Sequence, residues 1–243
     1  VLTSRGLGDV YKRQVYKSNS AIFVLMKAIE EYHSHFLDYL ANYNKPRNPR
    51  NLYDPVKYIL DIGGKRLRPI LTLMMTDCFG GHISKALDAA LAIEVFHNFS
   101  LVHDDIMDNA PLRRSKKTVH EKWDLNTGIL SGDAMLIMAY KLFESYDDNK
   151  FKKLSTLFSK TALEVCEGQQ YDIDFESRVD VSIGEYIKMI KYKTAVLVAS
   201  AMQMGAIIAD TSIENQEKCF KFGENLGIAF QLQDDYLDAF GDP

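Results

Sequence analysis

The sequence has little of what builds a disulfide scaffold or a zinc site. Among its 243 residues are only three cysteines, Cys78, Cys166 and Cys219, and they are widely spaced without a CxxC pair. An odd, dispersed set of this kind fits neither a disulfide framework nor a metal-thiolate centre. We therefore expect reduced core thiols in a cytoplasmic protein.

Long apolar runs are also missing. No stretch approaches the about 18 uninterrupted apolar residues that a spanning helix needs, so we expect no membrane span. Residues 1–20 lack the apolar core of a signal peptide and show no helical period. We interpret them as a disordered or foreign leader, followed by a single domain over residues 21–243.

An excess of positive charge is absent too. The net charge is −4, with 29 Lys and Arg against 33 Asp and Glu, which argues against a general nucleic-acid binder. Strand-like alternation is lacking throughout. Apolar residues recur instead at helical spacing and leave little polar face, which predicts an all-α fold, a large helical bundle around a central cavity.

The helical periods and their flanking residues predict where the helices begin and end. Asp54 is predicted to cap a helix with Pro55 at its first position, Ser182 with Glu185 forms a capping box, and Ser212 caps the last helix. The predicted helices cover residues 22–40, 55–61, 69–79, 84–108, 126–146, 151–172, 182–209 and 212–238.

The central predicted helix ends in HNFSLVHDDIMD, from His97 to Asp108. Asp104 and Asp108 are one turn apart on the same face of a helix, with Asp105 beside them. Because burying unpaired carboxylates is costly, a cation is expected to neutralise this cluster.

A second cluster repeats the DDxxD spacing at Asp234, Asp235 and Asp238, again at the end of an apolar helical run. One such motif is often only a solvated helix end. Two of them provide the oxygen ligands that Mg²⁺ prefers, together with substrate phosphates. The pair therefore indicates a magnesium-diphosphate clamp.

Cationic side chains gather in three other places. GGKRLRP brings Lys65, Arg66 and Arg68 next to a tight glycine turn, which is either an exposed basic turn or an anion site that needs no metal. Arg113 and Arg114 directly follow the first acidic cluster. Lys193 lies in an apolar helix and therefore either extends to the surface or meets a buried anion.

The order of the motifs GGKRLRP, HNFSLVHDDIMD, GQQYD, KYKTA and FQLQDDYLD resembles the trans-isoprenyl diphosphate synthases over residues 22–243. The resemblance implies a prenyltransferase that joins isopentenyl diphosphate head to tail to an allylic diphosphate. It also implies two DDxxD motifs facing each other across a deep cavity, a homodimer, and about three Mg²⁺ ions bound between carboxylates and diphosphate.

The resemblance also assigns roles to matching positions. The isopentenyl diphosphate site would comprise Lys65, Arg68, His97 and Arg114. The magnesium ligands would be Asp104, Asp108 and Asp234. Contacts to the allylic substrate would come from Arg113, Lys193 and Gln231, and carbocation stabilisation from Thr194 and Gln231. More indirect roles would belong to Asp105, Asp235, Asp238, Gln169 and Asp172.

Product length is assigned by the residues before Asp104. A bulky Phe99 and a small Ser100, with no insertion in the first motif, resemble geranylgeranyl-type synthases most and farnesyl-type synthases second. The chain stops at Pro243, where the family continues, so we expect a C-terminal truncation relative to the family. A longer-chain synthase, a non-catalytic partner subunit, a class I terpene cyclase and a magnesium-binding structural bundle are the alternatives.

Overall fold

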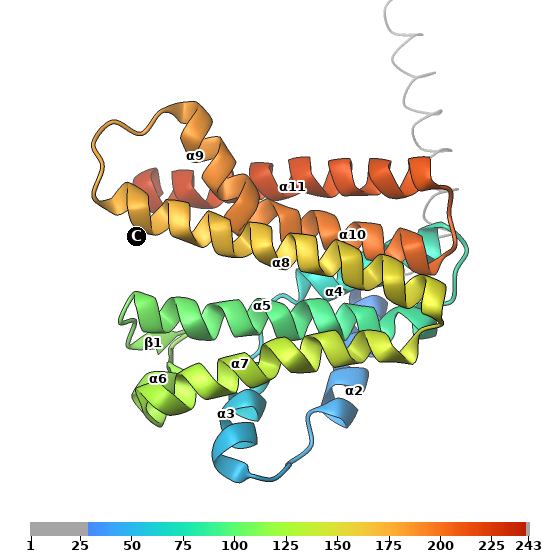
Figure 1. Cartoon of the computed structure of the whole chain (residues 1–243), viewed down its shortest axis with the longest axis horizontal. Coiled ribbons are helices and arrows are strands. Elements are labelled where there is room, and N and C mark those ends of the chain that lie inside the picture. Colours follow the sequence, from blue (N-terminus) through green and yellow to red (C-terminus); the bar gives the residue numbers. More distant parts are fainter. Residues whose placement is uncertain (1–28, 242–243) are drawn as a thin grey trace, which may run out of the picture.

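The computed structural model describes residues 29–241, and the predicted leader and the start of the first predicted helix lie outside these residues. The all-α prediction is confirmed (Figure 1). The α-helices are α2 (Ile29–Tyr43), α3 (Arg50–Asp61), α4 (Leu67–Cys78), α5 (Leu87–Met107), α6 (Val119–Lys122), α7 (Leu125–Lys141), α8 (Asp148–Glu176), α9 (Ile183–Ile190), α10 (Val196–Ile208) and α11 (Ile213–Phe240). Short 3₁₀ turns cover Ile83–Ala86 and Leu142–Ser145, a π-turn covers Lys191–Ala195, and β1 (Leu112–Arg113) pairs antiparallel with β2 (Lys116–Lys117).

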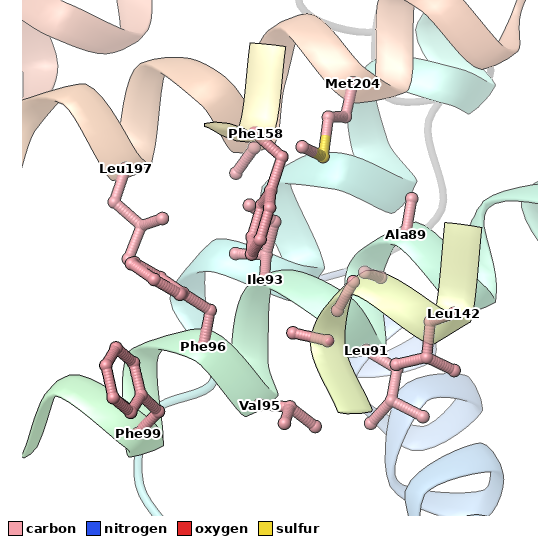
Figure 2. Close-up of a cluster of buried hydrophobic side chains, with 14 of the residues drawn as sticks. Ala89, Leu91, Ile93, Val95, Phe96, Phe99, Leu142, Phe158, Leu197 and Met204 are labelled. Atoms are coloured by element: carbon pink, nitrogen blue, oxygen red, sulfur yellow. The ribbon is translucent and has the colours of Figure 1, made fainter. Parts of the chain in front are cut away.

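Helix α5 is the centre of the bundle and packs against α4, α7 and α10. Its residues are apolar on almost every side, which is the pattern of a helix surrounded by others. Figure 2 shows the core around it, where Phe96 of α5 points toward Leu197 and lies beside Phe158. The Phe158 ring meets Phe96 edge-on at 5.1 Å and Phe143 at the same centroid distance. Interlocked aromatic packing of this kind holds α5 and α8 in fixed register.

The C-terminal ends of α5, α8 and α11 gather at one end of the bundle, at the left of Figure 1, together with α9 and the β1–β2 hairpin. Both acidic clusters lie on these helix ends. Segments separated by more than a hundred residues in the sequence therefore meet at one end of the molecule.

Several predicted boundaries are wrong. Asp54 is not a helix cap: α3 begins at Arg50, and Pro55 lies inside it. The backbone N–H of Tyr53 already donates to the Pro49 carbonyl at 3.2 Å, so a helical turn forms before Pro55. Because proline has no backbone N–H, Pro55 leaves one hydrogen bond of this helix unmade. The helix predicted over residues 182–209 is divided by the π-turn. The capping box at Ser182 and the cap at Ser212 are confirmed.

The prediction of core thiols is correct only for Cys219, which is buried, whereas Cys78 and Cys166 are exposed and all three are free. Within residues 29–241, no helix is both long enough and apolar enough to cross a membrane.

Candidate functional site

Asp104, in the last turn of α5, carries a carboxylate that its surroundings only partly compensate. Its side chain is 20% exposed, and its Oδ1 atom is buried without a hydrogen-bond partner among the described residues. Burial raises the pKa of Asp104, the Lys193 ammonium opposes this, and the neighbouring Asp108 raises it further. An oxygen in this condition is ready to accept a cation.

Lys193 is the nearest cation from another helix segment. Its Nζ lies 3.9 Å from Asp104 Oδ1 and forms an ion pair with Asp172 of α8. Of the two alternatives left open by the sequence, the structure therefore shows Lys193 meeting anions. It projects from the π-turn, a rare local widening of a helix that is common at functional sites.

The π-turn packs directly against the backbone of α8 because residue 168 is glycine. A Cβ atom at Gly168 would lie 2.1 Å from the backbone N of Lys193. The absence of a side chain here thus brings the two segments into contact and fixes where the Lys193 side chain begins.

Asp105 points to a different partner. It is 1% exposed and accepts from Arg113, with Nε at 2.8 Å and Nη2 at 2.7 Å from Oδ1. The same guanidinium lies 3.6 Å from Asp104 Oδ2. Arg113, which is predicted to contact substrate, therefore reaches from the β1–β2 hairpin to the first acidic cluster and pairs with it.

The second acidic cluster is held by a chain of hydrogen bonds. Thr194 of the π-turn donates to Gln231 Oε1 at 2.9 Å, and the Gln231 amide donates to Asp235 Oδ1 at 2.8 Å. Tyr186 of α9 donates to Asp235 Oδ2. The structure thus unites the predicted Thr194 and Gln231, and it adds Tyr186, which no local sequence pattern singled out.

Asp234 is half-buried, whereas Asp108 and Asp238 are exposed. In the described part of the chain, no three His, Cys, Asp or Glu side chains converge closely enough to hold a metal ion by themselves. Each cluster instead offers one or two carboxylates, which is how Mg²⁺ is usually held when substrate phosphates complete its shell.

A basic cavity of about 480 Å³ lies beside the Gly63–Arg68 loop. Lys65, Arg66, Arg68 and Arg114 line it. Arg114 donates to the Gly63 carbonyl, and a Cβ atom at position 64 would lie 2.7 Å from the Arg114 guanidinium. Gly64, with φ of +131°, thus provides both the turn and the space for Arg114.

An apolar cavity of about 290 Å³ lies on the other side of Arg68 and His97, which line both cavities. Arg68 Nη1 is 3.2 Å from His97 Nε2. Since a guanidinium can only donate, this contact requires Nε2 of a neutral His97. Burial lowers the pKa of His97 well below its ordinary value, and the positive Arg68 and Arg114 lower it further.

The apolar cavity extends from Asp104 and Lys193 past Thr194 and Leu197 to Phe99. Phe99 is 9% exposed, and its ring packs 5.4 Å from Phe96 and 4.8 Å from His103. The remaining wall comes mostly from α8; its α8 residues are Val165, Cys166, Gln169, Gln170 and Ile173.

Comparison with known proteins identifies the family to which this fold belongs. The polyprenyl synthetase family model matches residues 49–243. The chain belongs to the polyprenyl synthetase family. It is 40% identical over 192 residues to the geranylgeranyl diphosphate synthase of Methanosarcina mazei, covering 78% of this chain and 59% of that protein. It therefore spans about three fifths of that curated relative.

Solved structures of polyprenyl synthetases agree with this assignment. A crystal structure of a geranylgeranyl pyrophosphate synthase is 61% identical, with a TM-score of 0.88 over 90% of this chain and 67% of that one. The Caulobacter crescentus polyprenyl synthase, solved with calcium and isoprenyl diphosphate, is 28% identical with a TM-score of 0.79, over 86% of this chain and 62% of that one.

Proposed function

We propose that the protein is a trans-prenyltransferase that condenses isopentenyl diphosphate with an allylic diphosphate, with geranylgeranyl diphosphate as its main product. One observation carries the proposal: a cationic cavity and an apolar cavity share Arg68 and His97 as their common wall. The first suits a diphosphate bound without metal. The second suits a hydrocarbon chain whose diphosphate end lies at the carboxylates.

Asp104, Asp108 and Asp234 would hold the magnesium. The unbonded, buried Oδ1 of Asp104 and the oxygen-only donor set fit a hard cation. Bound Mg²⁺ would supply Lewis-acid neutralisation of the leaving diphosphate. The about three ions expected in the family, and the homodimer, are part of this proposal.

Lys193 would add a fixed positive charge at the same diphosphate, since its Nζ already faces Asp104 and Asp172. Thr194 donates its hydroxyl hydrogen to Gln231. The lone pairs of the Thr194 oxygen therefore remain free to face the positive charge that develops when the allylic C–O bond breaks.

Lys65, Arg68 and Arg114 would hold isopentenyl diphosphate beside the allylic carbon whose C–O bond breaks. Its double bond forms the new C–C bond as the allylic C–O bond breaks, and the proton then lost goes to the released diphosphate. Neutral His97 receives a hydrogen bond from Arg68 and so keeps the guanidinium directed along the shared wall. The apolar lining excludes water, which would otherwise capture the allylic cation.

Product analysis tests the proposal. The full-length protein would be given labelled isopentenyl diphosphate with dimethylallyl, geranyl or farnesyl diphosphate and Mg²⁺, and the dephosphorylated products would be separated by chromatography. We expect the C20 alcohol from all three primers. Accumulation at C15 would support the farnesyl alternative, and no elongation of any primer by the folded protein would contradict the proposal and favour a non-catalytic subunit.

A further inference from the structure

Arg66 and Glu94 form a buried ion pair that the proposed reaction does not use. Their side chains are 2% and 3% exposed, and Arg66 Nη1 donates to Glu94 Oε1. Arg66 also donates to the Leu60 carbonyl, and Asn98 Nδ2 donates to Glu94 Oε1 at 2.9 Å. Burying two charges is expensive, so a buried pair by itself is weak evidence for stability. Its location at the basic cavity suggests a role in binding.

The pair joins the two walls of the basic cavity. Arg66, with φ of 48°, connects the glycine turn to α4 and stands between Lys65 and Arg68. Glu94 lies on α5, nearly one turn before His97. Both members of the pair line the basic cavity.

Glu94 brings a negative charge to a cavity that otherwise suits an anion. Among the residues that line it, Glu94 is the one carboxylate, beside four Lys and Arg side chains. At low local dielectric, an unpaired carboxylate would strongly oppose a bound diphosphate. Arg66 forms the ion pair with Glu94, and Lys65, Arg68 and Arg114 have no ion-pair partner of their own among the described residues.

We infer that Arg66 is a positioning residue of the metal-free diphosphate site, acting through Glu94: it neutralises a carboxylate that would otherwise repel the substrate. The inference rests on the proposed function, because it takes the basic cavity as the diphosphate site. Arg66 itself is committed to Glu94 and Leu60 and does not need to touch the substrate.

Binding of inorganic diphosphate without metal, measured by calorimetry on the full-length protein, tests this role. Arg66→Met should weaken binding by about tenfold or more, because a buried carboxylate then faces the anion. Arg66→Met/Glu94→Gln should return to within about threefold of wild type, since the charge is gone. Glu94→Gln alone keeps an oxygen acceptor for Arg66 and should bind diphosphate at least as tightly as wild type.

Kinetics separate this role from a merely structural one. Arg66→Met should raise the KM for isopentenyl diphosphate and change the KM for the allylic substrate by less than about twofold. Glu224→Gln is the matched control, because Glu224 is also a buried carboxylate paired with lysines, Lys191 and Lys221, but it does not line the basic cavity. It should leave diphosphate binding unchanged.

The outcomes that overturn the inference are distinct from failure of the proposed function. A double variant as weak as Arg66→Met, or an Arg66→Met protein that binds normally, overturns it. If Arg66→Met does not fold, the inference is overturned by a Glu94→Gln protein that binds diphosphate more weakly than wild type. Failure of the proposed function is shown instead by a folded wild type that elongates no primer.

Discussion

Asp104 shows how a single residue can trade stability for binding. Its pKa is raised above 3.8, mainly by burial, so the folded protein holds the ionised form less favourably than the unfolded chain does. The resulting destabilisation is present at neutral pH and disappears as the pH falls through the folded-state pKa toward 3.8. Asp104→Asn should therefore raise the melting temperature of the metal-free protein at pH 7, and less so near pH 4.

The same substitution should abolish turnover, because it removes a proposed magnesium ligand, and Asp234→Ala should do so too. Melting curves at the two pH values and single-turnover assays at moderate magnesium check both statements. Near-normal turnover in either variant would rule out the magnesium-diphosphate clamp proposed for the two acidic clusters.

Arg68 is proposed to bind one of the two substrates and not the other. It lines both cavities, but its guanidinium lies with the cations of the basic cavity. Arg68→Ala removes a charge-assisted contact worth about 1.5–3 kcal/mol, so the KM for isopentenyl diphosphate should rise roughly ten- to a hundredfold. The KM for the allylic substrate should rise much less, and equal increases would mean that the sites are misassigned.

Phe99 is predicted to limit product length. The structure places it on the wall of the apolar cavity, braced between Phe96 and His103, with Ser100 beside it. Phe99→Ala should open the cavity and lengthen the product by one or more five-carbon units, at a stability cost below the roughly 3–5 kcal/mol typical of a fully buried Phe.

Phe143→Ala is the control, since Phe143 is fully buried outside that cavity. It should lose stability without changing the product. Chromatography of dephosphorylated products shows whether Phe99 limits product length. An unchanged product distribution from Phe99→Ala would mean that Phe99 is a packing residue only.

At the scale of elements, the contact between α8 and the π-turn sets the position of Lys193. Gly168→Ala inserts a methyl group against the Lys193 backbone, so it should cost about 1–3 kcal/mol of stability and lower kcat by displacing the Lys193 ammonium. Gly184→Ala in α9 is the control, because a Cβ there meets nothing within 4 Å. Denaturant unfolding and steady-state kinetics compare them, and a Gly168→Ala enzyme with normal kcat would contradict the role of this contact.

Elements with strong local signals were predictable from sequence. The capping box at Ser182 and the cap at Ser212 depend on residues three apart, and both are present. The π-turn and the early start of α3 were not, because each lies in a contact between segments distant in sequence: the π-turn packs against Gly168 of α8, and α3 packs against α5 and α7.

The same distinction between local signals and long-range contacts applies to the candidate site. The acidic motifs were predictable because Asp residues recur at helical spacing, and the basic motif was predictable because three cations lie next to a glycine turn. Tyr186 reaches Asp235 across 49 residues, and Arg66 reaches Glu94 across 28, and no periodicity connects either pair. Long-range partners of this kind emerge only when the helices are placed in space.

At the scale of the molecule, the site is divided between two sets of helices. The α4–α5 side supplies the basic loop and the first acidic cluster, whereas the π-turn and α11 supply Lys193, Thr194 and the second cluster. Within residues 29–241, no three His, Cys, Asp or Glu side chains lie close enough together to hold a metal ion. Under the proposed function, a diphosphate bound with Mg²⁺ at the acidic clusters would contact both sides, so binding should stabilise the whole fold.

This connection predicts cooperative stabilisation by the two ligands. A ligand at a hundredfold excess over its Kd adds about 2.7 kcal/mol to the free energy of unfolding. Mg²⁺ alone meets separate carboxylates and should shift the melting temperature little, whereas diphosphate alone should bind the basic cavity and shift it moderately. Together they should shift it by more than the sum, because a second diphosphate can then bind with Mg²⁺ at the acidic clusters. Asp104→Asn should lose the excess and keep the shift from diphosphate alone. Differential scanning fluorimetry over a matrix of both concentrations measures this, and strictly additive shifts in the wild type would show that magnesium and diphosphate bind independently.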